Sequence, residues 1–240
     1  MNNSIIIHDL GLLDYEKALN FQLKLFNEIV NTKISNRRNS SKNQTNNHLV
    51  FVEHTSVYTL GKSGKMNNLL IGNKELETKK IKFYKTNRGG DITYHGPGQI
   101  VCYPILDLDN FFTDIHKYLR YLEEVVILTL KSYGINASRS KNETGVWLDP
   151  NYSSARKICA LGVKASRWVT MHGLALNVNN DLNFFNHIIP CGIEDKSVTS
   201  ISKECKKNID IKLVKRKIIK NFLKVFSAKL SWFNQKNKLE

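Results

Sequence analysis

Neighbouring pairs of strand-like segments are the feature that most constrains how this chain can fold. Residues 143–148, 156–165 and 172–178 are three apolar runs separated by polar turns, and residues 48–54 and 100–108 are two more. Strands joined by short turns pair antiparallel, whereas parallel neighbours need a longer crossover. With helical segments between other strands, the sequence predicts an α+β (broadly α/β) fold: one domain over residues 1–240, with a mixed sheet flanked by helices.

Amphipathic segments predict the helices that flank this sheet. Residues 14–30 repeat apolar side chains at helical spacing, with Asp14 in the position of an N-cap, and residues 113–133 show the clearest helical period of the chain. A third periodic segment predicts a C-terminal helix over residues 208–240. Residues 31–47 are polar and poor in apolar side chains, which predicts a flexible surface loop.

The chain is strongly basic, with a formal net charge of +15. One interpretation is an acidic partner, such as nucleic acid, an anionic membrane or an acidic protein. The other is compositional, because Asn, Lys and Ile are abundant throughout, as an AT-rich genome produces. The lysines are spread rather than clustered, and no aromatic-basic RNA motif occurs, which favours the compositional interpretation.

The cysteines and the apolar segments indicate the compartment. None of the four cysteines (Cys102, Cys159, Cys191 and Cys205) forms a C-x-x-C pair or has zinc-site spacing, so no structural metal is expected. The sequence has no secretory leader and no long apolar run, which predicts reduced thiols, a cytoplasmic location and no membrane span. Cys102 and Cys159 lie in apolar strands and are expected to be buried, and Cys205 lies in a lysine-rich stretch and is expected to be exposed.

Residues 88–99, "RGGDITYHGPGQ", have the glycine density of a ligand-binding loop. Glycines let the backbone approach a ligand closely, and their N–H groups can hold an oxygen or an anion. Arg88 adds a planar cation, and His95 adds a group that titrates near neutral pH. The segment matches neither a dinucleotide-binding fingerprint nor a phosphate-binding P-loop, so its pattern alone names no ligand.

Cys191 is the best candidate nucleophile, because it lies between Pro190 and Gly192 on what should be a shaped loop. A thiol attacks as its thiolate, which a neighbouring lysine or histidine favours. An inert turn cysteine remains an equal alternative from these residues alone. Lys157 opens an otherwise small and apolar strand, where a lysine can serve as a base. His172 precedes Gly173 and is a possible site residue or a locally bonded strand-end histidine.

Six segments, taken in order, resemble one known family. They are "EHTSVYTLGKSG", "RGGDITYHGPGQIVCYPILDL", "GVWL", "KICALGVK", "HGLALNV" and "PCGIEDKSVTS", and the resemblance runs over about residues 8–202. Together they resemble the octanoyltransferase family, also called lipoyl(octanoyl) transferase or lipoate-protein ligase B. The resemblance implies the biotin and lipoate ligase catalytic-domain fold. It also implies transfer of an octanoyl or lipoyl group from acyl carrier protein to a lysine of a lipoyl domain, the first step of endogenous protein lipoylation.

The family's site residues carry over onto matching positions. Cys191 matches the acyl-thioester cysteine, and Lys157 matches the lysine that lowers the pKa of that thiol or acts as its base. Cys159 stands where a small alanine is usual, which could reshape the acyl pocket or add a reactive thiol. The substrate-binding positions implied by the resemblance are Arg88, Gly89, Gly90, Asp91, Ile92, Thr93, Tyr94, His95, Ala160, Leu161, Gly162, Gly173, Leu174 and Ala175.

The resemblance also implies the partners. Acyl carrier protein would deliver the acyl group on its phosphopantetheine arm, so neither ATP nor a metal is expected. The acceptors would be lipoyl domains of 2-oxoacid dehydrogenase E2 subunits and the glycine cleavage H protein, and a monomer is expected. Three alternatives remain: an ATP-dependent lipoate or biotin ligase of the same fold, a basic nucleic-acid-binding protein, and a non-catalytic protein that binds lipoyl domains.

Overall fold

The computed structural model of the chain describes residues 2–141, 143–189 and 197–234, the last three of these by their backbone only. Cys191, the predicted nucleophile, lies outside the described residues.

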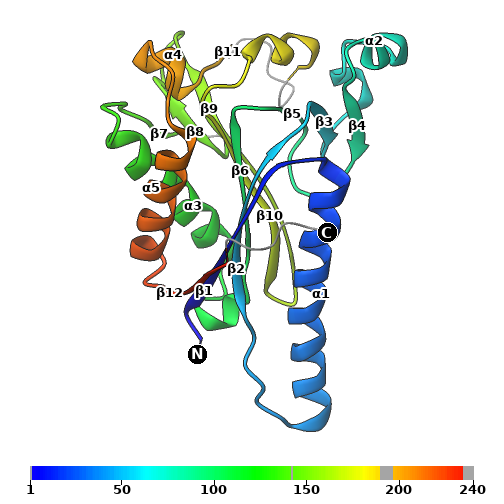
Figure 1. Ribbon diagram of the computed structural model, residues 1–240, viewed down its shortest axis with the longest axis vertical. Coiled ribbons are helices and arrows are strands. Elements are labelled where there is room, and N and C mark those ends of the chain that lie inside the picture. The colour runs from blue at the N-terminus through cyan, green and yellow to red at the C-terminus, as the bar shows by residue number, and fades with distance from the viewer. Residues whose placement is uncertain (1, 142, 190–196, 235–240) are drawn as a thin grey trace.

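A nine-stranded mixed sheet forms the centre of the molecule (Figure 1). Its order is β12-β1-β2-β6-β10-β9-β8-β7, and β11 pairs with β9 beside this path. Strand β1 is parallel to both of its neighbours, β2 and β12. The pairs β2–β6, β6–β10 and β10–β9 are antiparallel. The strands are β1 (Ser4–Leu13), β2 (Asn47–His54), β6 (Gln99–Ile105), β7 (Ser138–Arg139), β8 (Val146–Leu148), β9 (Arg156–Ser166), β10 (Val169–Asn177), β11 (Ser197–Val198) and β12 (Lys229–Asn234).

Helices cover both faces of this sheet. The helices α3 (Ile115–Lys131) and α5 (Ile211–Val225) pack on one face, and α1 (Tyr15–Asn39) packs on the other (Figure 1). The apolar stripe of α3 and α5 meets strand residues such as Phe51 and Leu176 to form the main core. Burying such side chains contributes roughly 1.5–3 kcal/mol each, which fixes the helices on the sheet.

A second, three-stranded sheet lies at one end of the large sheet, and its order is β4-β3-β5. A small apolar core, with Tyr58 and Tyr94 fully buried, joins this sheet to its helices. The remaining elements are β3 (Val57–Leu60), η1 (Met66–Asn68), α2 (Asn73–Thr78), β4 (Lys82–Lys85), β5 (Ile92–His95), η2 (Leu108–Asn110), η3 (Leu182–His187) and α4 (Ile201–Cys205). The glycine-rich segment therefore contains a strand, β5, where a loop was expected.

The predicted fold class is confirmed: a single domain with a mixed sheet flanked by helices. Helix α3 begins and ends within two residues of its prediction. Asp14 is the N-cap of α1, because its side chain accepts a hydrogen bond from the backbone N–H of Glu16 at 2.9 Å. Among the described residues, no helix is long and apolar enough to cross a bilayer.

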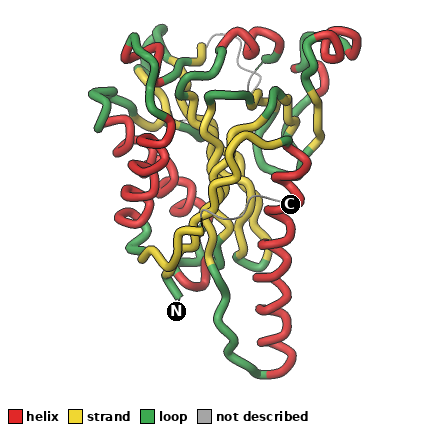
Figure 2. Tube along the Cα trace, viewed as in Figure 1, coloured by secondary structure: helices red, strands yellow, loops and turns green. Residues whose placement is uncertain are grey.

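The predicted flexible loop at 31–47 is wrong over its first half, because α1 continues to Asn39 (Figure 2). Tertiary contacts stabilise these last turns despite their polar sequence. Lys33 bonds both Asp107 and Asp109, and the side chain of Asn36 bonds the backbone of Asn43 in both directions. The returning segment is thus tied to the helix.

The predicted C-terminal helix over 208–240 is also wrong in its extent. Helix α5 ends at Val225, and the chain then turns at Ser227, whose φ is 50°. It continues as β12, which pairs in parallel with β1 from Ser4↔Lys229 onward. A strand at the sheet edge gains backbone hydrogen bonds that the local helical period does not reveal.

Candidate active site

A cavity of about 380 Å³ lies between the β9–β10 hairpin, β6 and the segment that contains β5. Two more segments complete its wall, one from residues 143–147 and one from β11. Its volume lies in the range of small-ligand sites, about 300–1,000 Å³. Most of its wall is apolar, with Val101, Leu161 and Leu174 among the lining side chains. This combination suits an apolar chain with a few polar contacts.

The structure brings most of the predicted site residues to this one cavity. Both Lys157 and His172 line it. So do twelve of the predicted substrate-binding positions: Arg88, Gly90, Asp91, Ile92, Thr93, His95, Ala160, Leu161, Gly162, Gly173, Leu174 and Ala175. The chain segments that resemble the family thus converge in space although they are far apart in sequence.

Gly89 and Tyr94 are not among the residues that line the cavity. The Gly89 N–H donates to the Val163 carbonyl at 2.9 Å, which joins the glycine-rich segment to β9. Tyr94 points into the small core, where its ring stacks on Phe184 with centroids 4.7 Å apart. These two residues support the cavity wall from behind.

Arg88 is buried, and its guanidinium organises the backbone of its own segment. It donates to the Thr59 carbonyl at 2.6 Å, to the Asp91 carbonyl at 2.7 Å and to the Gly89 carbonyl at 3.0 Å. Its planar fork matches three carbonyls at once, which an ammonium on a flexible stem would not do. Arg88 therefore shapes the wall as well as lining it.

Two buried histidines, His95 in the cavity wall and His54 beside Tyr103 of that wall, each have a side-chain hydrogen-bond partner. The Nε2 of His54 lies 2.7 Å from the Tyr103 hydroxyl, and the Nδ1 of His95 lies 2.8 Å from the Gln99 side-chain oxygen. Burial lowers the pKa of His54 to about 4 and that of His95 to about 3, because the charged form is poorly solvated there. Both imidazoles are therefore neutral near pH 7.

His172 lies at the cavity in a strained backbone conformation. Its φ is 60°, in the left-handed region that non-glycine residues seldom adopt. Its Nε2 lies 2.8 Å from the Asn87 side-chain oxygen, and its N–H donates to the Gln22 side-chain oxygen at 3.1 Å. Burial, followed by the nearby Arg88 charge, lowers the pKa of His172 to about 3. Backbone strain held by such contacts is characteristic of functional sites.

A β-bulge at Ile158 gives Lys157 its direction. Val146 pairs with Cys159, but Trp147 pairs with Lys157, so β9 carries one extra residue opposite β8. Ile158 and Cys159 both lie in the main core, whereas Lys157 and Ala160 both line the cavity. Bulges of this kind re-aim side chains beside active sites. Lys157 is half-buried, and its ammonium lies 4.5 Å from the centre of the Trp147 ring.

The chain on both sides of residues 190–196 is held at this end of the molecule. The Ile189 N–H donates to the Asn68 carbonyl at 2.8 Å, just before the segment. Just after it, Val198 pairs with Lys157 in the β11–β9 ladder, and Ser197 and Val198 line the cavity. After the segment that contains Cys191, the described chain therefore resumes directly beside Lys157.

The three described cysteines are not among the residues that line the cavity. Cys102 and Cys159 are buried in the main core as predicted, and burial raises the pKa of both thiols. Cys205 is half-buried and packs against the same core, so its predicted exposure is wrong. Within the described ranges, no three His, Cys, Asp or Glu side chains gather in a way that could hold a metal ion.

Sequence reasoning missed several residues that line the cavity. Tyr15 follows an N-cap and was assigned only to a helix, and Trp147 was assigned only to a strand. Gln99 ends the glycine-rich segment that was predicted to bind a ligand, and the rest come from elements that meet only in the folded chain. Besides Tyr15 and Trp147, the missed residues are Ser63, Gln99, Val101, Tyr103, Glu143, Thr144, Phe185, Asn177, Ser197 and Val198.

Comparisons with known proteins identify relatives of this chain. The sequence profile of the lipoyl protein ligase A/B catalytic domain matches residues 14–223. An octanoyltransferase of Christiangramia forsetii is 59% identical over 97% of this chain and 100% of its own length. An octanoyltransferase of Bacteroides fragilis is 46% identical over 93% of this chain and 99% of its own length. These relatives confirm the resemblance to the octanoyltransferase family.

Solved structures share the fold at low sequence identity. A bipartite lipoate protein ligase of Thermoplasma acidophilum superposes with a TM-score of 0.68 at 15% identity, over 98% of this chain and 88% of that one. A lipoate-protein ligase A crystallised with ATP superposes with a TM-score of 0.67 at 16% identity, over 98% and 90%. With the family profile and the close relatives, they show that the chain belongs to the family of lipoyl protein ligase A/B catalytic domains.

Proposed function

We propose that this protein moves an octanoyl group from acyl carrier protein to a lysine of a lipoyl domain, through a thioester on Cys191. The enzyme is an octanoyltransferase, the activity that its relatives carry by name over nearly their full length. The observation that carries the proposal is the cavity, which places Lys157 at the edge of an apolar wall beside the end of the Cys191 segment.

The proposed reaction consists of two successive acyl transfers, and neither needs a further reagent. The Cys191 thiolate attacks the carbonyl carbon of the incoming thioester, and the carrier's thiolate leaves and takes up a proton. The amine of the acceptor lysine then attacks the Cys191 thioester, which forms an amide and releases the Cys191 thiol. The acyl chain would lie along Val101, Leu161 and Leu174 during both steps.

Lys157 has two roles in this proposal. Its positive charge favours the Cys191 thiolate, and its amine relays the proton that the attacking acceptor amine loses. The half-buried position strengthens both effects, because a charge acts more strongly where water is partly excluded. Backbone N–H groups of the glycine-rich segment are candidates for stabilising the oxyanion.

The incoming thioester is already activated, so the proposed reaction requires neither ATP nor a metal. The rival is an ATP-dependent lipoate or biotin ligase, which adenylates a free acid and needs no nucleophilic cysteine. The shared fold is compatible with both chemistries. The relatives at 46–59% identity carry the octanoyltransferase name, which favours thioester exchange.

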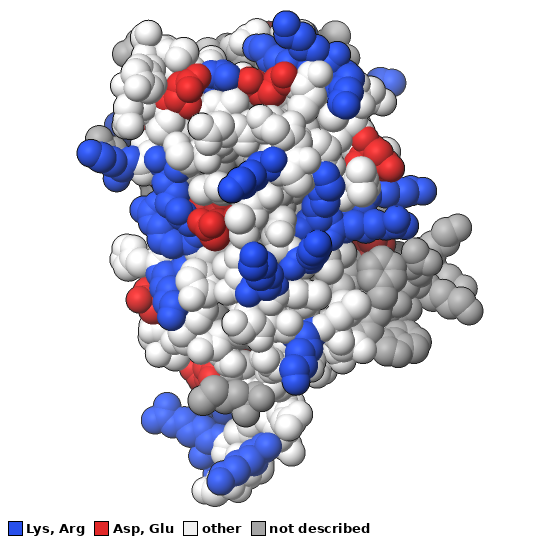
Figure 3. Space-filling model, turned by 90° about the vertical axis from the view of Figure 1, so that its left-hand side faces the viewer, with Lys and Arg blue, Asp and Glu red and all other residues white. Residues whose placement is uncertain are grey.

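The surface charge supports acidic partners, namely acyl carrier protein as donor and lipoyl domains as acceptors. The expected acceptors are lipoyl domains of 2-oxoacid dehydrogenase E2 subunits and the glycine cleavage H protein. The enzyme is expected to act as a monomer. Basic side chains spread over the face that carries α3 and α5, with few acidic ones among them (Figure 3). Complementary charge raises the encounter rate of such partners. The exposed basic residues of α5 are Lys212, Arg216, Lys220 and Lys224.

Intact-mass measurement tests the proposal. The wild type and the variants Cys191→Ser and Lys157→Ala are each mixed with octanoyl-acyl carrier protein. The intact mass of each protein is measured, and peptide mapping then locates any adduct. We expect an octanoyl adduct on Cys191 that an apo lipoyl domain removes, no such thioester in Cys191→Ser, and slower formation in Lys157→Ala. Transfer that appears only with ATP and free octanoate, with no adduct, would assign the chain to the ligases instead.

A further inference from the structure

Glu123 of α3 is a fully buried carboxylate outside the cavity. Its Oε2 accepts hydrogen bonds from Arg120 at 2.8 Å and from Arg139 at 3.1 Å. Its Oε1 accepts a hydrogen bond from the backbone N–H of Gly145 at 3.0 Å. A buried carboxylate is costly unless such partners satisfy it, so these bonds fix the geometry of all three neighbours.

Gly145, in turn, lies directly against the side chain of Lys157. A Cβ on Gly145 would meet the Lys157 Cε at 3.4 Å and the Cys159 carbonyl oxygen at 2.8 Å. The φ of Gly145 is 129°, which an L-residue with a side chain rarely adopts. Only a glycine allows the backbone at residue 145 to pack this closely against the Lys157 side chain.

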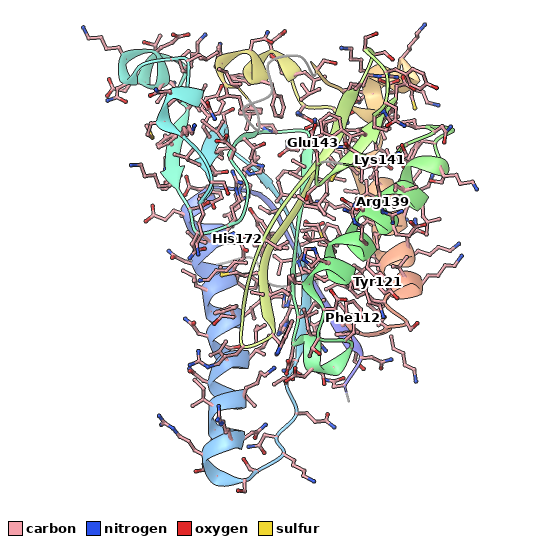
Figure 4. All side chains as sticks on the ribbon, turned by 180° about the vertical axis from the view of Figure 1, so that it is seen from behind. Phe112, Tyr121, Arg139, Lys141, Glu143 and His172 are labelled. Atoms are coloured by element: carbon pink, nitrogen blue, oxygen red, sulfur yellow. The ribbon has the colours of Figure 1, made fainter. Side chains whose placement is uncertain are left out.

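Trp147 holds the same lysine from a second direction. It pairs with Lys157 across the β8–β9 ladder, and its ring lies 4.5 Å from the Lys157 ammonium. A cation over an indole ring is stabilised by the ring's negative face. Arg139 and Glu143 follow one another from beside α3 toward the end of the sheet where β8 begins (Figure 4). The segment 143–147 thus connects the Glu123 carboxylate to the lysine.

We propose that Glu123 is a positioning residue for Lys157, acting through Gly145. Its carboxylate anchors the Gly145 N–H, and the anchored segment keeps the lysine side chain between the Gly145 backbone and the Trp147 ring. The inference rests on the proposed function for the catalytic value of that position, but the position itself is open to direct measurement.

The substitution Glu123→Asp is the sharpest perturbation. It keeps the negative charge for Arg120 and Arg139, but the shorter side chain withdraws from the Gly145 N–H. Glu124→Gln is the matched control, because Glu124 is the next residue of α3 and bonds Arg139 at 2.6 Å without contacting Gly145. Glu123→Gln is a second variant that keeps the side-chain length and removes the charge.

The first measurement reports the position of Lys157 without involving Cys191. Protons on the lysine side chain above the Trp147 ring take an upfield ring-current shift in the NMR spectrum. We expect this shift to shrink in Glu123→Asp and to stay at its wild-type value in Glu124→Gln. An unchanged shift in Glu123→Asp and in Glu123→Gln would overturn the inference.

The second measurement is a double-mutant cycle on the reactivity of Cys191. The rate of Cys191 alkylation by iodoacetamide at pH 7 is followed by peptide mapping, which separates it from the other three cysteines. We expect Glu123→Asp to slow alkylation about fivefold through the thiolate fraction. In a Lys157→Ala background the same substitution should have no further effect, because coupled residues are not additive.

The outcomes separate the two hypotheses. A further slowing by Glu123→Asp in the Lys157→Ala background would show a general structural effect and overturn the inference. If Lys157→Ala itself leaves alkylation unchanged, the proposed pairing of Lys157 with Cys191 fails, whatever the NMR shift shows. Melting temperatures of every variant check that each is folded.

Discussion

Gly162 of β9 and Gly89 of the glycine-rich segment approach so closely that a methyl group on Gly162 would lie 2.8 Å from the Gly89 carbonyl oxygen. The same methyl would lie 3.2 Å from the Arg88 Cδ. Backbone atoms cannot yield as a flexible side chain can, so this contact fixes the spacing between β9 and the wall opposite it.

Gly162→Ala is therefore expected to reshape the cavity. The added methyl pushes the Arg88–Gly89 backbone away or tilts β9, and either change misplaces a bound acyl chain. We expect octanoyl transfer to fall about tenfold, as sub-ångström misplacement of reacting groups is costly, and butyryl transfer to fall less. Gly72→Ala is the control, because a Cβ there meets no atom within 4 Å. Equal losses for octanoyl and butyryl donors would contradict this account of the wall.

Cys159→Ala should leave activity close to that of the wild type. The thiol lies in the main core and not on the cavity wall, so an alanine there changes neither the acyl site nor its charges. The loss of buried sulfur contacts should lower the free energy of unfolding by about 1 kcal/mol. Steady-state transfer assays and urea titrations measure the two effects, and a large activity change would place Cys159 at the acyl chain after all.

Acid should destabilise the fold below about pH 6.5, the ordinary pKa of histidine. Burial lowers the pKa of His48 and His54 to about 4 and that of His95 and His172 to about 3. The unfolded chain therefore binds more protons than the folded one as the pH falls from 6.5 toward 4. Stability is level above pH 6.5 and decreases below it by about 1.4 kcal/mol per histidine per pH unit.

Urea midpoints at pH 7.5, 6.5 and 5.5 check this dependence. The variant His54→Gln should show a shallower loss between pH 6.5 and 5.5, because one of the buried histidines no longer takes up a proton on unfolding. His116→Gln, at an exposed position of α3, should match the wild-type slope. A midpoint that stays constant down to pH 5.5 would contradict the neutral, buried state of these histidines.

Asp107→Asn should loosen the end of α1. The Asp107 carboxylate accepts hydrogen bonds from Lys33 and, at 2.8 Å, from the Thr45 hydroxyl. Removing its charge should lower the free energy of unfolding by about 2 kcal/mol, the value of hydrogen bonds to a charged group. Hydrogen–deuterium exchange should then speed up over residues 31–39. Glu75→Gln, which breaks an exposed pair with Lys79, should leave that exchange unchanged.

Local sequence patterns predicted the elements that local forces determine. The helical period placed α3, and the glycine density of residues 88–99 marked one wall of the cavity. The strand β12 was missed because its partner β1 lies more than 200 residues away, and a strand's register depends on that partner. The last turns of α1 were missed because Lys33 reaches a carboxylate from another element.

In the candidate site, too, residues in local motifs were predicted and residues brought in by tertiary contacts were not. The family resemblance supplied Lys157 and twelve other lining positions, because they lie in contiguous motifs. Tyr15 and Tyr103 were not predicted to line the cavity, since each belongs to an ordinary helix or strand pattern and reaches the site through the packing of α1 on the sheet. Such convergence is a property of the tertiary fold.

The extra residue at Ile158 changes which alternate side chains of β9 face the cavity. Before it, the odd position Lys157 faces the cavity; after it, the even position Ala160 does. In a regular strand that kept every residue, side chains would alternate back from Ala160, so Ile158 would face the cavity and Lys157 would face the apolar core. The bulge, rather than any change to the lysine itself, thus places this amine at the cavity instead of in the core.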